Sequence, residues 1–253
     1  MGSPLSILDY RQPVEFRIGD VIVRTWTVLS RHFLTFLLLV GIAELIPLVV
    51  TLYLGEAAEV AKAKDFRALF LALPLGLLQF ILVAFAQAIV VHAAFQDLRG
   101  RQVSATESFQ HGVQRLFPVL VASVLSGLMM VVGLILCLIP GLIAIAALAV
   151  VLPACVVERL GPIDSISRSI DLTTGNRWPI LGVVVAWGLI VATISGIIGV
   201  GMAFAPGLPV QLIQWVWEVV AGSFSAVYAA ILYHDLRAVR EGIGIDEIAS
   251  VFD

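Results

Sequence analysis

Residues 138–178 read LIPGLIAIAALAVVLPACVVERLGPIDSISRSIDLTTGNRW, an apolar run that opens on a Pro-Gly pair and ends in a polar segment. The apolar part, 141–157, is continuous and does not alternate with polar residues, which predicts a membrane helix and not a barrel strand. It is at the short end of the roughly 17–25 residues that a helix needs to cross a bilayer. The polar part, 158–178, is either a reactive loop or a helix on the membrane surface.

The composition of the whole chain favours a membrane protein. Hydrophobic residues make up 60% of its 253 residues and charged residues 13%, against about 45–50% and 25% in soluble domains. A net charge of −3 without a basic, aromatic-rich tract argues against a nucleic-acid partner. Cys137 and Cys155 both lie inside apolar runs, so we interpret them as small hydrophobic residues. We expect no metal and no cofactor.

Six apolar segments are long enough to cross a hydrocarbon core of about 30 Å. They cover residues 33–54, 68–95, 116–139, 141–157, 179–205 and 209–233. Pro and Gly interrupt the chain at 138–141 and 206–209, and links this short make the flanking spans antiparallel neighbours. The sequence therefore predicts an all-α integral membrane protein, with six transmembrane helices arranged as three hairpins in one domain, 1–253.

The basic residues predict the orientation. Twelve of the fifteen Lys and Arg residues fall on one side of the six spans, and only Lys62, Lys64 and Arg67 fall on the other. Because basic residues collect in cytoplasmic loops, we expect both termini, 1–32 and 238–253, to be cytoplasmic.

Each predicted hairpin follows a polar segment that carries an apolar stripe at helical spacing. These segments lie within 1–32, at about 103–115 and at about 162–175. Their expected anchors are Ile18, Ile22, Trp26 and Leu29 in the first, Phe109 in the second, and Ile163, Ile166 and Ile170 in the third. The pattern is typical of helices that lie in a membrane interface, with apolar residues inward and Ser, Asp and Arg outward. We read three units, each an amphipathic cytoplasmic helix followed by a hairpin.

Residues typical of helix ends favour the interpretation of residues 158–178 as a surface helix. Gly161-Pro162 suits a helix start, Asp164 suits its first turn, and Gly175 suits a C-terminal cap. The segment has no histidine to activate a nucleophile, and the chain has no phosphate-binding loop or other catalytic motif. We expect a protein without enzymatic activity.

The same stretch carries a family resemblance. The matching motifs are LIPG at 138–141, LPA at 152–154, ERLGPIDSISRS at 158–169, LTTGNRW at 172–178 and YHDLRAVREG at 233–242. They resemble the membrane domain that is fused to some bacterial glycerophosphoryl diester phosphodiesterases, and its stand-alone relatives. In the fused proteins the phosphodiesterase chemistry belongs to a separate soluble barrel. The resemblance therefore implies an accessory, lipid-associated module of the bacterial inner membrane without its own activity.

Two acids lie deep in predicted spans, where ionisable groups are costly and often functional. Glu44 is eleven residues into the first span and Glu218 nine residues into the sixth, which places both near mid-depth. Gln79 and Gln87 in the second span are candidate polar partners. The pair either forms part of a proton or ion path, or consists of two neutral carboxylic acids hydrogen-bonded between helices.

Arginines at predicted cytoplasmic helix ends are candidates for lipid headgroup contacts. The tripeptide Asp-Leu-Arg occurs at 97–99 and again at 235–237, and Arg177 follows the third amphipathic segment. We therefore expect Arg99, Arg177 and Arg237 to contact headgroups. The four histidines have no metal-ligand spacing, and we expect His111 to be solvated.

These features predict a non-catalytic bacterial inner-membrane protein that organises lipids or serves as an accessory or scaffold module. The alternatives are a small-solute or ion/proton transporter or channel using Glu44 and Glu218, and a subunit of a larger membrane complex. The expected partners are membrane lipids, with a homo-oligomer or membrane-complex partner as a further option and no nucleic acid.

Overall fold

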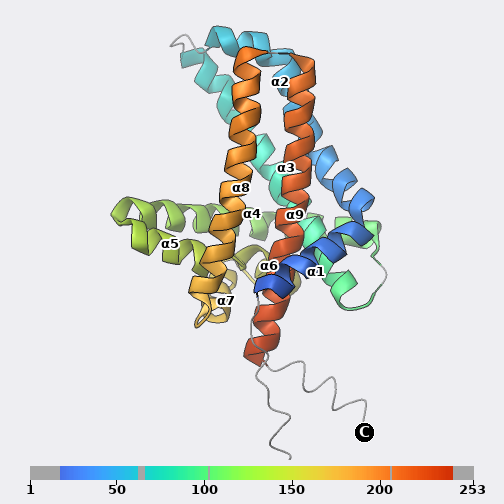
Figure 1. Ribbon diagram of the computed structural model, residues 1–253, viewed down its shortest axis with the longest axis vertical. Helices are drawn as coiled ribbons and strands as arrows, with labels where there is room; N and C mark the ends of the chain where they lie inside the picture. The colour runs from blue at the N-terminus through green and yellow to red at the C-terminus, as the bar shows by residue number, and fades with distance from the viewer. Residues whose placement is uncertain (1–17, 62–65, 102, 206, 242–253) are drawn as a thin grey trace, which may run out of the picture.

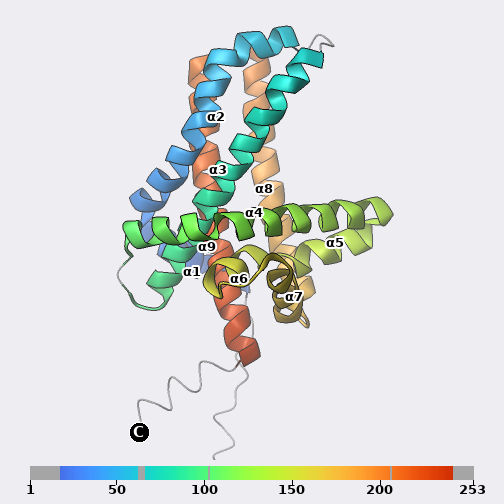
Figure 2. The ribbon, with the colours of Figure 1, turned by 180° about the vertical axis from the view of Figure 1, so that it is seen from behind.

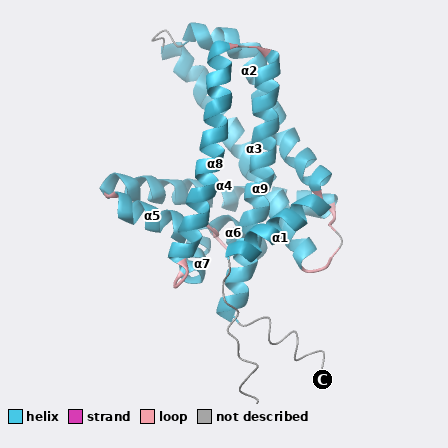
Figure 3. Ribbon diagram, in the orientation of Figure 1, coloured by secondary structure: helices cyan, strands magenta, loops and turns pink. Residues whose placement is uncertain are grey.

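The computed structural model describes residues 18–61, 66–101, 103–205 and 207–241. Throughout these ranges the secondary structure is helical, which confirms the all-α class (Figure 3). In chain order the helices are α1 (Ile18–Arg31), α2 (Phe33–Ala61), α3 (Phe66–Leu98), α4 (Ala105–Leu136), α5 (Leu138–Ala147), α6 (Val151–Val157), α7 (Pro162–Thr173), α8 (Arg177–Phe204) and α9 (Leu208–Glu241).

Five stretches of these helices are long and apolar enough to cross a membrane. They are Gly76–Leu98, Thr106–Leu136, Leu138–Val157, Arg177–Phe204 and Leu208–Glu241. A sixth is reached if α1 and the first part of α2, which meet at 85°, count as one bent span. The chain is therefore a multi-pass membrane protein, as its composition predicts. The predicted outer-loop residues Lys62 and Lys64 and the ends of the chain, 1–17 and 242–253, lie outside the described residues.

The helices do not all run in one direction. In both Figure 1 and Figure 2, α2, α3, α8 and α9 follow the long axis of the molecule, whereas α4 and α5 lie across it as a side arm. The pairs α2 with α3, α4 with α5, and α8 with α9 are each in contact. Because the second pair crosses the others, the arrangement as three transmembrane hairpins stays a prediction.

The second amphipathic segment is not separate from the span that follows it. Ser104 caps the start of α4, since the Glu107 amide donates to Ser104 Oγ at 3.3 Å, whereas the Ser104 amide donates to Gln96 Oε1. From there α4 runs without a break to Leu136, through Pro118. No Pro-Gly pair interrupts it, and Gly112 packs so closely on α3 that an added Cβ would lie 2.6 Å from Ile89 Cγ1. The expected helix at 103–115 is thus the first part of a longer one.

The fourth predicted span consists of two helices, α5 and α6. A side chain of α7 bonds to the backbone at the break between them. Three residues, 148–150, separate the two helices and leave backbone groups without helical partners. Ser169 Oγ donates to the Ala147 carbonyl at 2.7 Å and accepts from the Val150 amide at 3.3 Å. A non-helical backbone at such a depth is tolerated only where protein satisfies it, and this hydroxyl does so.

The face of α7 that packs on the protein differs from the prediction. Ser165, Ser169 and Thr173 are fully buried, so the hydroxyl groups expected to face outward point into the protein. Ile166 is buried in a small cluster with Ala122, Leu148 and Val151, and Ile170 packs against it. Ile163 alone of the three predicted anchors is exposed. The interpretation of Ile166 and Ile170 as membrane anchors is therefore wrong, because the α5–α6 break needs the hydroxyl-bearing face.

Helix α1 has two apolar faces where one was predicted. Val21, Val28 and Leu29 are buried against the bundle. Ile22 and Trp26 remain exposed, so of these three predicted anchors only Leu29 is covered by protein. The side chain of Ile18, the first residue of α1, is outside the described set.

Candidate functional site

The Asp-Leu-Arg tripeptides at 97–99 and 235–237 are called the DLR segments. The first of them ends α3 in a turn that contains two arginines. Gly100 has φ +67°, and its amide donates to the Asp97 carbonyl at 2.9 Å. The Arg101 amide donates to the Gln96 carbonyl at 3.0 Å. These two bonds form a Schellman motif, which needs the left-handed conformation that glycine adopts without strain. The turn places Arg99 and Arg101 on either side of Gly100.

The two DLR segments, far apart in the sequence, line one pocket. It has a volume of about 400 Å³ and lies between the end of α3 and the last turns of α9. Its lining residues are Phe95, Leu98, Arg99, Arg101, His234, Arg237 and Ala238. Three guanidinium groups and an imidazole thus share a pocket to which no carboxylate contributes among the described residues.

The acidic residues next to this pocket already have partners, and for Asp235 these include His234 of the pocket at 3.2 Å. Asp97 accepts from His32 Nε2 at 2.9 Å, and Asp235 accepts from Arg24 Nη1 at 2.9 Å. Both interactions hold α1 across the ends of α3 and α9. Arg237 Nε donates to Glu241 at 2.6 Å, while the Arg99 guanidinium lies 4.5 Å above the Phe95 ring. Among the described residues, no carboxylate lies within ion-pair distance of Arg99 or Arg101.

Another acid, Glu158, holds α7 in place through an ion pair. Arg168 on α7 donates to both carboxylate oxygens of Glu158 at 2.9–3.1 Å, and the Tyr233 hydroxyl donates to the same group. Arg168 also pairs with Glu241 at the end of α9. Burial lowers the pKa of the Arg168 guanidinium, but its bonds to these two acids outweigh that effect and raise the pKa above its ordinary value. Glu158 and Arg168 of the polar stretch therefore form a structural clamp.

Of the predicted headgroup residues, the structure brings Arg99 and Arg237 together. Arg177 lies elsewhere, at the start of α8, where its Nη2 donates to Thr174 at 3.4 Å. Sequence reasoning missed Arg101 and His234 as members of the same pocket. The signal was present, because each flanks a DLR tripeptide, in DLRGR and HDLR.

A family model described as a domain of unknown function, DUF7847, matches residues 108–236. This chain belongs to the DUF7847 family. The matched DUF7847 region begins in the first turn of α4 and ends in the last turns of α9. It includes His234 of the pocket but not Arg99 or Arg101, so the pocket forms at the boundary between the DUF7847 region and α3. No curated protein and no solved structure matches the chain.

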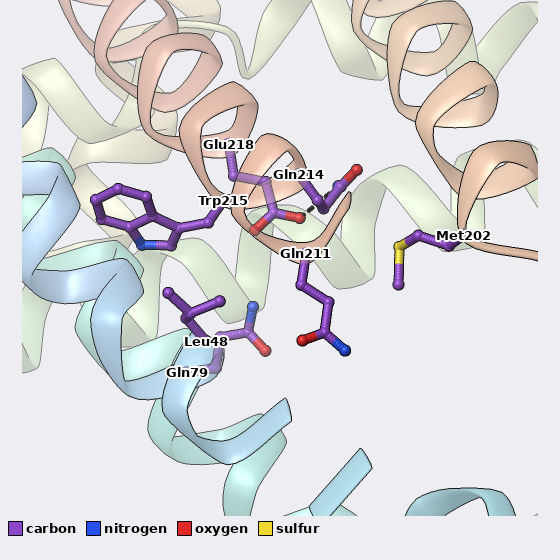
Figure 4. Close-up of a pocket in the computed structure, with 7 residues that line it drawn as sticks. All are labelled: Leu48, Gln79, Met202, Gln211, Gln214, Trp215 and Glu218. Carbon is purple, nitrogen blue, oxygen red and sulfur yellow. Dashed lines mark hydrogen bonds between the residues drawn. The ribbon is translucent and has the colours of Figure 1, made fainter. Parts of the chain in front are cut away.

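Glu218, one of the two predicted deep acids, lines a second, smaller cavity. It has a volume of about 140 Å³ and is lined by Leu48, Gln79, Met202, Gln211, Gln214, Trp215 and Glu218. Figure 4 shows the Gln79, Gln211, Gln214 and Glu218 side chains converging on the space between α2, α3 and α9, with Met202 on α8 opposite. Gln87, also predicted as a partner, does not line the cavity.

The histidines of α3 and α4 differ from expectation. His111 is buried, and its Nε2 lies 2.9 Å from the Val156 carbonyl, so the prediction of a solvated side chain is wrong. Its ring stacks on His92 at 4.2 Å between centroids. Phe109, a predicted anchor, is half exposed and packs edge-on against Phe85. Among the described residues, no group of three His, Cys, Asp or Glu could hold a metal ion.

Proposed function

We propose that this protein is a non-catalytic, lipid-associated membrane module that binds an anionic phospholipid headgroup in the pocket between α3 and α9. The observation that carries the proposal is the meeting of both DLR segments around a basic pocket. Guanidinium groups bind phosphate through paired hydrogen bonds, and Arg99 and Arg101 are not used by any described carboxylate. The volume of about 400 Å³ suits a headgroup.

Helix α1 supports a position of this pocket at the membrane surface. It meets α2 at 85°, so α1 lies along the surface if α2 crosses the bilayer. Its ion pair from Arg24 to Asp235 holds it beside the pocket, with Ile22 and Trp26 exposed. Aromatic and apolar side chains in this position are typical of interfacial helices.

The broader assignment is part of the same proposal. We propose a bacterial inner-membrane location with both termini cytoplasmic, because twelve of fifteen basic residues lie on one side of the predicted spans. The resemblance to the membrane domain of glycerophosphoryl diester phosphodiesterases is compatible with DUF7847 membership and with an accessory role in organising lipids. We also propose that the module acts together with a second copy of the chain or with a partner in a membrane complex.

Removing two pocket arginines tests headgroup binding. In the purified, delipidated full chain, the double substitution Arg99→Gln, Arg101→Gln is expected to weaken binding of dioleoylphosphatidylglycerol at least about tenfold, because charge-assisted hydrogen bonds are lost. Native mass spectrometry with titrated lipid measures this change. Binding of dioleoylphosphatidylcholine is expected to be weak in both proteins.

The matched control also removes two arginine charges at this end of the molecule, but from positions outside the pocket. Arg159 and Arg240 are both exposed and outside the pocket. The variant Arg159→Gln, Arg240→Gln is expected to bind phosphatidylglycerol as the parent does. An equal loss in both double variants, or no preference for phosphatidylglycerol over phosphatidylcholine, contradicts the proposed site.

Cysteine labelling tests the proposed orientation and the three hairpins. In a background with Cys137→Ser and Cys155→Ala, a membrane-impermeant maleimide on intact cells is expected to label Leu208→Cys at the α8–α9 turn. Arg240→Cys is expected to react only after lysis. Leu136→Cys, at the exposed tip of α4, is expected to react from outside if α4 and α5 form a hairpin that crosses the membrane.

Two labelling results would contradict these expectations. Labelling of Arg240→Cys in intact cells contradicts cytoplasmic termini. If Leu136→Cys reacts neither before nor after lysis, the tip of the α4–α5 arm stays within the membrane and the three-hairpin arrangement is wrong.

A further inference from the structure

We propose that the cavity between α2, α3 and α9 binds a hard cation through oxygen ligands, and that the ion enters from the end of the molecule opposite the headgroup pocket. This site is separate from the proposed function and does not depend on it. It uses two carboxylates and two or three amide side chains.

Two amide side chains and one acid lie along one face of α9. Gln211, Gln214 and Glu218 follow the i, i+3, i+7 spacing of a helix face. Gln214 Nε2 donates to Glu218 Oε1 at 2.7 Å, which orients the carboxylate toward the cavity (Figure 4). Gln79 on α3 faces the same space.

Glu44 does not line the cavity itself, but it lies on the face of α2 that borders it. On α2, Gly41, Glu44 and Leu48 also follow the i, i+3, i+7 spacing. Gly41 packs on the Trp215 ring, with an added Cβ 3.5 Å from the ring, and Leu48 lines the cavity together with Trp215. Glu44 therefore lies on the face of α2 that packs against α9 beside this cavity.

The oxygens beside the cavity lack partners that a cation would supply. Glu44 is only 7% exposed, and its Oε2 is buried without a hydrogen-bond partner. The same holds for Gln211 Oε1 and Gln214 Oε1. A buried polar atom without a partner costs about 1–3 kcal/mol. Protonation of Glu44 alone would leave the two amide oxygens unsatisfied, whereas a bound cation takes oxygen atoms as its ligands.

Size and charge fit a partly hydrated ion. The cavity of about 140 Å³ has room for a cation with several waters, since one water needs only about 10–15 Å³. No Lys, Arg or His is among the described residues that line it, so the Glu218 carboxylate has no positive counterpart there. Carboxylate and amide oxygens are the ligands that hard cations such as Ca²⁺ and Na⁺ prefer.

The cavity lies toward one end of the helix bundle. Met202 and Gln211, which line it, lie near the α8–α9 turn, at the end of the molecule opposite α1 and α7 (Figure 1). Beyond Glu218, α9 is packed through a long run that includes the buried Ala226, Ile231 and Tyr233. The geometry thus favours a binding site reached from one side over an open channel.

Isotope binding to the purified full chain tests this site. Saturable binding of ⁴⁵Ca²⁺ or ²²Na⁺ is expected, measured by scintillation proximity at constant ionic strength with N-methylglucamine as the inert cation. With two carboxylates, the dissociation constant is expected near 10⁻⁴–10⁻³ M, about that of weak protein Ca²⁺ sites. Glu218→Gln and, separately, Glu44→Gln are expected to weaken binding at least about tenfold. The isotope that binds identifies the ion class.

The control is Glu107→Gln, which removes the same charge from an exposed position at the start of α4. It is expected to bind like the parent. If Glu44→Gln does not fold, Glu218→Gln and Gln211→Leu, both at the cavity wall, decide the question. The proposal is overturned if neither isotope shows saturable binding, or if folded Glu218→Gln binds as tightly as Glu107→Gln.

Discussion

Replacing Glu158 by alanine is expected to destabilise the protein by about 3 kcal/mol, since removing one partner of a largely buried ion pair leaves the other charge unpaired. Glu158 accepts bonds from Arg168 and from the Tyr233 hydroxyl, and their side chains are mostly buried. Without it, α7 loses its tie to α6, and Arg168 keeps only its pair with Glu241. The expected fall in Tm is about 6–12 °C for a chain of this size. Thermal unfolding in detergent measures it.

The control for this prediction lies on α7, the helix that Glu158 holds through Arg168. Asp171 is an exposed acid of α7, and Asp171→Ala is expected to leave Tm within about 2 °C of the parent, as most exposed substitutions do. A Glu158→Ala variant as stable as Asp171→Ala shows that the clamp does not hold α7. A large loss in both shows instead that α7 tolerates no charge change.

The substitution Gly141→Ala is expected to destabilise the packing of α4 on α5 by about 2 kcal/mol, the cost typical of overpacking. A Cβ at this position lies 2.4 Å from Leu134 Cδ2 and 2.8 Å from the Leu134 Cα atom. The side chain can move, but the backbone atom moves only if α4 and α5 separate. Gly133 approaches Gly141 from the other helix, at 3.1 Å for an added Cβ. The measurement is again thermal unfolding in detergent.

A glycine without neighbours provides the comparison. At Gly196 on α8 an added Cβ meets no atom within 4 Å. Gly196→Ala is expected to match or slightly exceed the stability of the parent, because alanine is the better helix former. If Gly141→Ala proves as stable as Gly196→Ala, the close approach of α4 and α5 is not a constraint on the native fold.

Local sequence patterns predicted the helices well. Continuous apolar runs predicted the spans, because a backbone in a membrane must satisfy its own hydrogen bonds. The Gly161-Pro162 pair predicted the start of α7. These features depend on neighbours within one turn, so they can be read from the sequence.

The candidate sites needed more than local patterns. The sequence showed two DLR tripeptides and two deep acids, but it could not show that each pair meets. Arg99 and Arg237 share a pocket only because α3 and α9 pack side by side. Glu44 and Glu218 approach only because α2 packs on α9, with Gly41 against Trp215.

The serines of α7 show where sequence reasoning failed. A hydroxyl on an amphipathic helix usually faces water, and the isoleucines looked like the buried stripe. The break between α5 and α6 reverses this, because the Ala147 carbonyl needs a donor and Ser169 provides one. No periodicity within residues 162–173 carries that information.

By itself, the sequence determined that this protein is helical, lies in a membrane, and carries arginines near helix ends and acids inside apolar segments, since composition and spacing along one helix control those properties. The tertiary structure decided which of these groups meet. Contacts between helices depend on side-chain shape and on backbone groups left free at breaks, and both arise only when distant segments pack together.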